Sequence, residues 1–178
     1  TLGIIGFGRI GQRVTQLLKD VFSDVLVYDP FVNPGVEKVF RVTRVTDIDD
    51  ILSESDVISI HCPLNNETKG LIDAQFIEKL EKSPIIVNTA RGELIENLDL
   101  LHGALLSGSI SAVGLDVLPD EPPVHNEFID YFSESGDARI IINPHTAYYS
   151  QESYTEMRVK AILNCVGFLN GSMVRNIL

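Results

Sequence analysis

GIIGFGRIG, from Gly3 to Gly11, is the stretch that decides the fold expected of this chain. It begins within an apolar run, Leu2–Ile5, and continues with Gly6, Gly8 and Gly11 at GxGxxG spacing. This order predicts a strand followed by a tight turn that opens a helix. In such a turn the first glycine allows the bend, the second lets a pyrophosphate approach the backbone, and the third lets the helix pack closely.

The residues after this turn support a dinucleotide site. Apolar residues follow at helical spacing and are predicted to pack on the strand: Ile10, Val14, Leu17 and Leu18. The free N–H groups at the start of the helix attract phosphate, and the Arg9 guanidinium could add to this attraction. A second apolar run ends in Asp29, where a carboxylate is expected to bond the adenosine ribose hydroxyls. The alternative is that Asp29-Pro30 only turns the chain.

Composition limits the class of protein. The chain has 178 residues, of which 44% are hydrophobic and 22% charged, as expected for one globular domain. A formal net charge of −11 disfavours nonspecific binding to nucleic acid or to an anionic membrane surface. Cys62 and Cys165 have no metal-site spacing and are expected to be reduced thiols of a cytoplasmic protein that holds no metal. The chain has neither a membrane-spanning run nor an initiator Met, and we expect it to be part of a longer protein.

Short runs rich in valine and isoleucine recur along the chain and mostly do not alternate with polar residues. They are Leu2–Ile5, Val25–Tyr28, Val57–Ile60, Ile85–Val87, Ala112–Leu115 and Ile140–Ile142. With helical patterns between most of them, they predict an α/β protein with a doubly wound parallel sheet, the Rossmann fold. A weaker strand, Arg41–Val45, is predicted at an edge of the sheet.

Helices are predicted from capping residues and spacing. The expected ranges are Asp47–Leu52, Asp73–Lys79, Asn97–Ser107 with Gly108 as its stop, and Gln151–Leu169. The segment Leu118–Gly136 is expected to be irregular, because two prolines follow Glu121. The last helix carries an apolar stripe, interpreted as core or domain-interface packing: Tyr154, Met157, Ala161, Ile162, Cys165, Phe168 and Leu169.

Residues able to bind ligands follow each apolar run. After the glycine turn and Asp29 come His61-Cys62-Pro63, Asn88-Thr89-Ala90-Arg91, Asp116 and Asn143-Pro144-His145. The carboxyl ends of strands in a doubly wound sheet line one crevice where ligands bind. We therefore expect residues 29, 91, 116 and 145 to meet in space.

Three side chains are candidates for catalysis, each with a structural alternative. Arg91 suits bidentate capture of a carboxylate, or it could pair with Glu93 or Glu96 and hold a loop. His145 is placed to act as a general acid or base, but alone it could equally be a structural histidine. Glu121 could be its carboxylate partner, a role for which Asp120 competes. The remaining histidines are expected to be structural: His61, His102 and His125.

At these residues the chain resembles the cofactor domain of the D-specific 2-hydroxyacid dehydrogenase family, over essentially its whole length. The matching motifs, in order, are GIIGFGRIG, VYDP, HCPLNNETKGLI, NTARGELI, GLDVLPDEP and NPHTAYYS. The ending HTAYYSQESYTEMR most resembles the branch that contains the C-terminal-binding-protein corepressors. That branch commonly has Trp where this chain has Tyr148.

The resemblance implies roles for individual residues. Arg91 would bind the substrate, His145 would be the catalytic histidine paired with Glu121, and Asp116 would contact the nicotinamide carboxamide. Glu121 argues against formate as substrate, because the formate dehydrogenase branch has Gln at that position. The residues expected to contact NAD are Gly6, Gly8, Arg9, Ile10, Gly11, Asp29, Cys62, Pro63, Thr68, Thr89, Ala90, Arg91, Asp116, His145, Ala147 and Tyr148.

The activity implied is hydride transfer between NAD and the carbon that bears the hydroxyl of a small 2-hydroxy acid. Protonated His145 would donate the proton during reduction while Glu121 stabilises the imidazolium. NAD is expected rather than NADP, because Pro30, Phe31 and Val32 supply no cation for a 2′-phosphate.

Alternatives to this enzyme remain open at the level of sequence. One is an NAD-sensing, corepressor-like binding protein, and another is a different Rossmann enzyme such as a methyltransferase. The family also implies a homodimer and a second, substrate-closing domain. Most of that domain is absent from this chain, and residues 151–178 would lead back toward it.

Overall fold

The structure is a computed structural model that describes residues 1–172 of the chain. The chain divides into two units, Thr1–Pro144 and His145–Leu178. The predicted tail at residues 173–178 lies outside the described residues.

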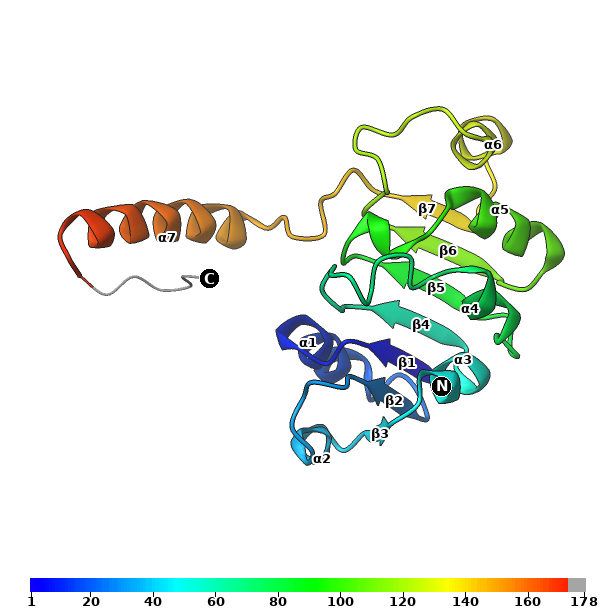
Figure 1. The fold of residues 1–178 in the computed structure, drawn as a ribbon, viewed down its shortest axis with the longest axis horizontal. Helices are drawn as coiled ribbons and strands as arrows, with labels where there is room; N and C mark the ends of the chain where they lie inside the picture. Colours follow the sequence, from blue (N-terminus) through cyan, green and yellow to red (C-terminus); the bar gives the residue numbers. More distant parts are fainter. Residues whose placement is uncertain (173–178) are drawn as a thin grey trace. The chain divides into compact units, whose positions relative to one another are not determined.

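The first unit is built on a seven-stranded sheet whose neighbouring strands are all parallel. Its order is β3-β2-β1-β4-β5-β6-β7, drawn from bottom to top in Figure 1. The strands are β1 (Leu2–Ile5), β2 (Val25–Tyr28), β3 (Thr43–Val45), β4 (Val57–Ile60), β5 (Ile85–Asn88), β6 (Ala112–Leu115) and β7 (Ile140–Ile142). The doubly wound sheet is thus confirmed, with β3 shorter than predicted and β5 one residue longer.

Alternate residues of the strands enter two separate cores, one on each face of the sheet. Leu2 and Ile4 of β1 pack with apolar residues of α1 (Arg9–Leu18) and α2 (Val36–Phe40). Ile5 of β1 and Ile58 and Ile60 of β4 pack in the larger core with apolar residues of further helices. Both faces of the sheet therefore contribute to burial, which explains why the strands read as continuous apolar runs.

The helices in the larger core begin where the capping residues predicted. They are α3 (Ile48–Glu54), α4 (Ala74–Glu78) and α5 (Leu98–Ser107). The side chains of Asp47, Asp73 and Asn97 each accept a backbone N–H of the first turn. Gly108 ends α5 at φ +80°, a conformation that glycine adopts without strain.

The structure differs from the sequence prediction at several elements. Residues Glu127–Ser135, expected to be irregular, form helix α6, which Asn126 caps and Gly136 ends. In α1 the buried residues are Gly11 and Thr15, whereas Ile10 and Leu17 are exposed. Of the predicted apolar residues of α1, Val14 and Leu18 pack against the core, whereas Ile10 and Leu17 do not, and the small Gly11 and Thr15 let the helix approach the sheet closely. A short 3-10 turn, η1 (Gly92–Leu94), was not predicted either.

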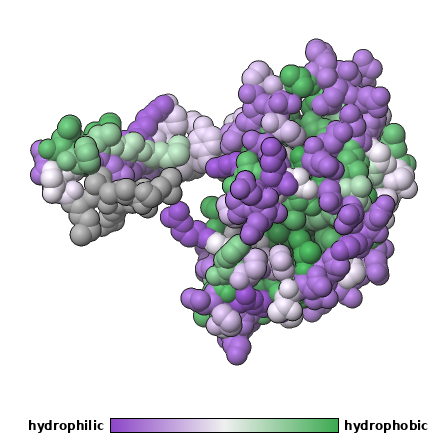
Figure 2. Space-filling view, in the orientation of Figure 1, coloured by the Kyte–Doolittle hydropathy of each residue, from purple (hydrophilic) through white to green (hydrophobic). Residues whose placement is uncertain are grey.

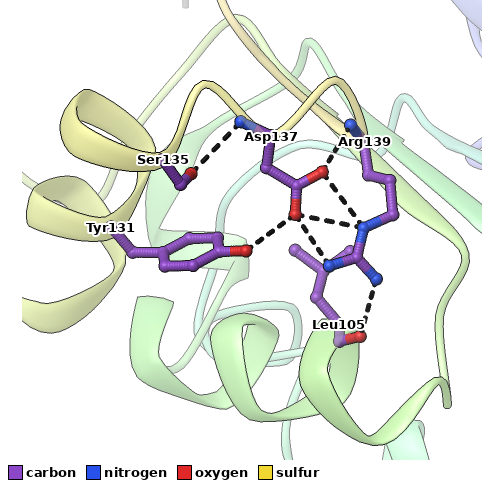
Figure 3. A network of polar contacts seen from close by, with 5 residues as sticks. All are labelled: Leu105, Tyr131, Ser135, Asp137 and Arg139. Atoms are coloured by element: carbon purple, nitrogen blue, oxygen red, sulfur yellow. Dashed lines mark hydrogen bonds and ion pairs between the residues drawn. The ribbon is translucent and has the colours of Figure 1, made fainter.

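A polar network joins α6 to β7 (Figure 3). The Asp137 carboxylate accepts hydrogen bonds from the Tyr131 hydroxyl at 2.9 Å and from Arg139 Nη2 at 2.7 Å. Arg139 Nη1 donates to the carbonyl of Leu105 in α5 at 3.1 Å. These bonds hold the pKa of Asp137 well below its usual range. The network fixes the entry of the chain into β7.

The second unit contains α7 (Gln151–Leu169), whose bounds match the prediction. Ser150 and Ser153 form its capping box. No residue of α7 is buried, and Figure 2 shows hydrophobic side chains, in green, on its surface. Core packing of the apolar stripe is therefore wrong for the described residues, whereas packing against a further domain stays a prediction. No helix within residues 1–172 is both long and apolar enough to cross a membrane.

Candidate functional site

The strands of the first unit end in one row across the sheet. Their last paired residues are in register from one strand to the next: Tyr28, Ile5, Ile60, Asn88, Leu115 and Ile142. The residues that follow them, among them Asp29, Arg91 and Asp116, therefore emerge at one edge of the sheet, formed by the carboxyl ends of the strands. Because neighbouring strands lie about 4.8 Å apart, the ends of β2 and β6 are separated by about 20 Å. This edge suits an elongated ligand.

The three glycines of the first turn meet different surroundings. A Cβ on Gly6, which has φ +91°, would lie 2.4 Å from the Cys62 nitrogen, and one on Gly11 would lie 2.1 Å from the Gly6 oxygen. Both positions therefore require glycine for close packing. A Cβ on Gly8 would meet no protein atom within 4 Å. Gly8 thus leaves its backbone open to a ligand, and this cradle fits the pyrophosphate of a dinucleotide.

Asp29 holds the glycine turn as well as its own loop. Its Oδ2 accepts the backbone N–H of Phe7 at 2.7 Å. Its Oδ1 accepts the N–H groups of Phe31 at 2.8 Å and Val32 at 3.2 Å. The alternative that this residue turns the chain is therefore correct in part. An ionised carboxylate still has further lone pairs that could accept ribose hydroxyls.

Arg44 is a cation beside this loop that the sequence prediction missed. From the edge strand β3 it donates to the carbonyl of Val32 at 2.7 Å and to the carbonyl of Asp29 at 2.9 Å. Pro30, Phe31 and Val32 supply no cation, as the sequence indicated, but Arg44 brings one to the same loop from a different strand. Only the pairing of β3 with β2, which sets Arg44 opposite Val27, brings it there.

A cavity of about 200 Å³ opens next to Asp29. Its walls are mainly apolar and come from β1, β2, α3 and the loop after β4; they include Ile5, Tyr28, Phe31, Ile48, Pro63 and Leu71. Cys62 also lines it, and burial raises the pKa of its thiol to about 11, so the thiol stays uncharged. An apolar cavity beside a carboxylate fits a planar base attached to a ribose.

The loop after β4 is braced by its own side chains. The Thr68 hydroxyl donates to the carbonyl of Pro63 at 2.6 Å, and the Asn65 carboxamide accepts the N–H of Thr68 at 3.0 Å. Contacts of Pro63 and Thr68 with a cofactor stay predictions, and the observed role of Thr68 is to hold the loop.

Arg91 is exposed and lies in the loop after β5. Its Nη1 donates to the carbonyl of Ala90 at 2.6 Å. Within residues 1–172 it makes no ion pair with Glu93 or Glu96, so the structural alternative for this residue is not observed. The guanidinium fork is suited to capture a carboxylate at this edge.

The loops after β5 and β6 are in direct contact. A Cβ on Gly92 would lie 2.0 Å from the carbonyl carbon of Leu118, so only glycine fits between the two loops. The N–H of Leu118 donates to Glu121 Oε1 at 3.0 Å. Asp116, at the start of the same loop, is 4% exposed, and its N–H donates to the carbonyl of Asn88 at 3.0 Å. Arg91, Asp116 and Glu121 are thereby carried on neighbouring, packed segments.

His145, Ala147 and Tyr148 belong to the second unit. His145 follows β7 after Asn143-Pro144 and has φ +53°, a conformation that histidine adopts more readily than most residues. Its approach to Arg91 and Glu121 stays a prediction.

The other histidines have structural surroundings. His61 Nε2 lies 2.9 Å from the Ser59 hydroxyl, and burial lowers the pKa of His61 to about 4. His102 packs on the Tyr131 ring with centroids 4.7 Å apart, and the exposed His125 bonds Asp130 at 2.9 Å. Both cysteines are free thiols, and among residues 1–172 no three or more His, Cys, Asp or Glu side chains gather to hold a metal.

Comparison with known proteins agrees with this arrangement. A family model described as "D-isomer specific 2-hydroxyacid dehydrogenase, NAD binding domain" matches residues 1–147. A hydroxypyruvate reductase from Blautia hydrogenotrophica is 39% identical over 97% of the chain and 51% of its own length. A glycerate dehydrogenase from Methylorubrum extorquens is 33% identical over 96% of the chain and 50% of its own length.

Solved structures show the same fold. The D-lactate dehydrogenase from Lactobacillus jensenii, crystallised with NAD+, has a TM-score of 0.85 and 32% identity, covering 99% of this chain and 55% of its own. An NAD-complexed D-2-hydroxyacid dehydrogenase from Lactobacillus delbrueckii gives a TM-score of 0.84 and 31% identity, with coverage of 99% and 55%. The chain therefore spans about half the length of these relatives.

Proposed function

The chain belongs to the D-isomer specific 2-hydroxyacid dehydrogenase family, and from this we propose that its protein interconverts a D-2-hydroxy acid and the corresponding 2-oxo acid. The observation that carries the proposal is the row of strand ends. It places the glycine turn, Asp29, the Arg91 loop and Asp116 along one edge of the sheet.

NAD would lie along this edge, with Gly8 facing the pyrophosphate, Asp29 the adenosine ribose, and Asp116 the nicotinamide carboxamide. Bound NAD supplies the hydride acceptor for oxidation, and NADH the donor for reduction. The open Gly8 and the apolar cavity beside Asp29 support this placement. Arg9, Ile10, Thr89 and Ala90 adjoin the same segments and are proposed as further contacts.

The chain's own side chains would handle the acid and the proton. Arg91 would bind the carboxylate of the 2-oxo acid and hold its carbonyl in place. His145 would donate a proton to the carbonyl oxygen in reduction and accept it in oxidation. Glu121 would stabilise the charged imidazole, and its bond to Leu118 supports a fixed position for the carboxylate.

An NAD-sensing, corepressor-like role is not favoured, because the relatives carry the names of reductases and dehydrogenases. We further propose that residues 1–178 form the cofactor domain, with residues 151–178 leading toward a substrate domain. We also propose that the protein is a cytoplasmic homodimer. The free thiols fit a reducing compartment, and the uncovered apolar side chains of α7 fit an interface.

Turnover by the full-length protein tests the proposal. NADH oxidation would be followed with hydroxypyruvate, pyruvate and glyoxylate, alongside a fluorescence titration of NADH. We expect reduction of at least one acid, and a loss of about 100-fold or more in kcat/KM for Arg91→Gln with little change in NADH affinity. NADH binding without reduction of any acid would instead favour the NAD-sensing protein.

A further inference from the structure

Asn88 is a completely buried polar side chain at the centre of the candidate site. It is the last residue of β5, is paired with Ile60 on one side and Leu115 on the other, and is 0% exposed. A buried carboxamide is stable only when its polar atoms are hydrogen-bonded. The roles assigned above do not use this side chain.

Both ends of the Asn88 carboxamide bond the loop that carries Arg91. Its Oδ1 accepts the N–H of Ala90 at 3.0 Å, and its Nδ2 donates to the carbonyl of Arg91 at 2.8 Å. A backbone N–H can only donate and a carbonyl can only accept, so these two partners fix the orientation of the carboxamide. A residue with no donor at Nδ2 would leave the Arg91 carbonyl only the longer bond from the N–H of Leu94 at 3.4 Å.

The Arg91 guanidinium depends on this backbone for its direction. The hydrogen bond observed for it runs to the carbonyl of Ala90, inside the same short loop. The Asn88 carbonyl also accepts the N–H of Asp116, so one residue ties the ends of β5 and β6 together. We infer that Asn88 is a positioning residue: it holds the 89–91 loop so that Arg91 presents its guanidinium to the substrate carboxylate. This inference rests on the proposed function.

Asn88→Asp gives the sharpest test, because a protonated carboxyl matches the amide in shape and in its donor and acceptor. Protonated, it can accept from Ala90 and donate to the Arg91 carbonyl. Ionised, it sets an oxygen anion against that carbonyl and loses the donor. Burial disfavours the ionised form, so the variant carboxyl will titrate above the usual range of an aspartate.

The measurement is kcat/KM for the best 2-oxo acid against pH in full-length wild type and Asn88→Asp, with NADH titration at each pH. We expect the variant-to-wild-type ratio to approach one in acid and to fall about 100-fold as the carboxyl ionises. The affinity for oxamate, an unreactive 2-oxo acid analogue, should fall in parallel while NADH affinity holds. For Asn88→Ala, kcat/KM should be lower than that of wild type by a factor that does not change with pH.

Two control variants separate positioning from loss of stability. Asn97→Asp makes the same chemical change at the cap of α5, where Asn97 accepts the N–H of Asp99, and should leave the pH ratio flat. Leu101→Ala opens a cavity in the hydrophobic core where α5 packs. It should lower Tm without changing oxamate affinity.

The positioning role would be overturned if the ratio of kcat/KM in Asn88→Asp to that in wild type did not change with pH and the variant bound oxamate as tightly as wild type. If Asn88→Ala does not fold, the Asp variant in acid still decides the question. A wild type that reduces no acid would count against the proposed function. If that wild type still binds oxamate, the parallel loss of oxamate affinity in Asn88→Asp would test the inference separately.

Discussion

The Asp29 carboxylate accepts the backbone N–H of Phe7 at 2.7 Å, which links the end of β2 to the glycine turn after β1. Asp29, which is expected to bind the ribose, thus also holds the glycine turn that is expected to bind the pyrophosphate. Two parts of one cofactor site are joined before any ligand binds, so a change at Asp29 will affect both.

The first prediction is a preference for NADH over NADPH. A 2′-phosphate would lie beside the Asp29 carboxylate, and the nearby Arg44 is already engaged with two carbonyls. We expect NADPH to bind at least about tenfold more weakly, equivalent to about 1.4 kcal/mol. Fluorescence titration of both cofactors measures the ratio, and equal affinities would contradict the role of Asp29.

Asp29→Asn tests the charge in that preference. Because its Nδ2 cannot accept a backbone N–H, the variant also loses part of the bonding of Asp29 to Phe7 or Phe31, and the two cofactors are therefore compared within the same variant. The variant should lower the ratio of the NADPH to the NADH dissociation constant, because the Asp29 charge no longer repels the 2′-phosphate. Asp24→Asn, a change of the same charge at an exposed residue just before β2, is the control and should leave the ratio unchanged. A ratio that moves equally in both variants would indicate only the overall charge of the protein.

Gly8→Ala should weaken NADH binding without destabilising the protein. The added methyl group meets no protein atom within 4 Å, so Tm should stay close to wild type. It would occupy the space through which the pyrophosphate approaches, and we expect a loss of about tenfold or more in NADH affinity. Gly11→Ala is the contrast, because its Cβ would lie 2.1 Å from the Gly6 oxygen and should lower Tm. Unchanged NADH affinity in Gly8→Ala would place the pyrophosphate elsewhere.

Gly92→Ala should separate the loops that carry Arg91 and Glu121. Its Cβ would fall 2.0 Å from backbone atoms of Leu118, so the loops must move apart, at a cost of about 1–3 kcal/mol in the free energy of unfolding. We expect kcat/KM for the 2-oxo acid to fall about 100-fold. Gly103→Ala is the matched control in α5, where the methyl group has open space and should stabilise the helix by about 0.5–1 kcal/mol.

Much of this fold could be read from the sequence because its signals are local. The strands are continuous apolar runs, and Asp47, Asp73 and Asn97 cap helices where capping residues were recognised. Helix α6 was missed although Asn126 and Gly136 mark its ends, because the prolines before it dominated the interpretation.

The site features that were missed depend on contacts between distant segments. Arg44 reaches Asp29 only through the register of an edge strand, which no local pattern specifies. Burial of Thr15 rather than Ile10 follows from how closely α1 approaches the sheet. The sequence places Asn88 at a strand end, but its bonds to Ala90 and Arg91 follow from the path of the folded loop.

Stability should depend on pH through His61. Burial lowers the pKa of this histidine to about 4 in the folded protein, against about 6.5 when unfolded. Between these values the unfolded chain binds a proton that the folded chain does not, so the free energy of unfolding rises with pH, by up to about 3 kcal/mol. Urea unfolding at a series of pH values should show this rise, and His61→Gln should remove it.

His125→Gln is the control for that measurement. Asp130 raises the pKa of the exposed His125, so any stability it contributes is present in acid and is lost as pH rises, the opposite sign. Its removal should therefore leave the rise between pH 4 and 6.5 in place. A His61→Gln variant that keeps the wild-type pH dependence would show that another group is responsible.

The last prediction tests the identity of the catalytic carboxylate. Glu121 accepts the N–H of Leu118 through Oε1, and Gln keeps an oxygen there, so Glu121→Gln should preserve the loop while removing its charge. If Glu121 stabilises the charged imidazole of His145, kcat for reduction should fall about 100-fold while NADH affinity stays unchanged. Asp120→Asn removes the same charge one residue away and should change kcat little.

Steady-state kinetics of the full-length protein with both variants, supported by Tm values, decides between the two acids. A large loss in Asp120→Asn with normal activity in Glu121→Gln would assign the role to Asp120. Normal activity in both variants would mean that proton transfer needs neither the Glu121 nor the Asp120 carboxylate.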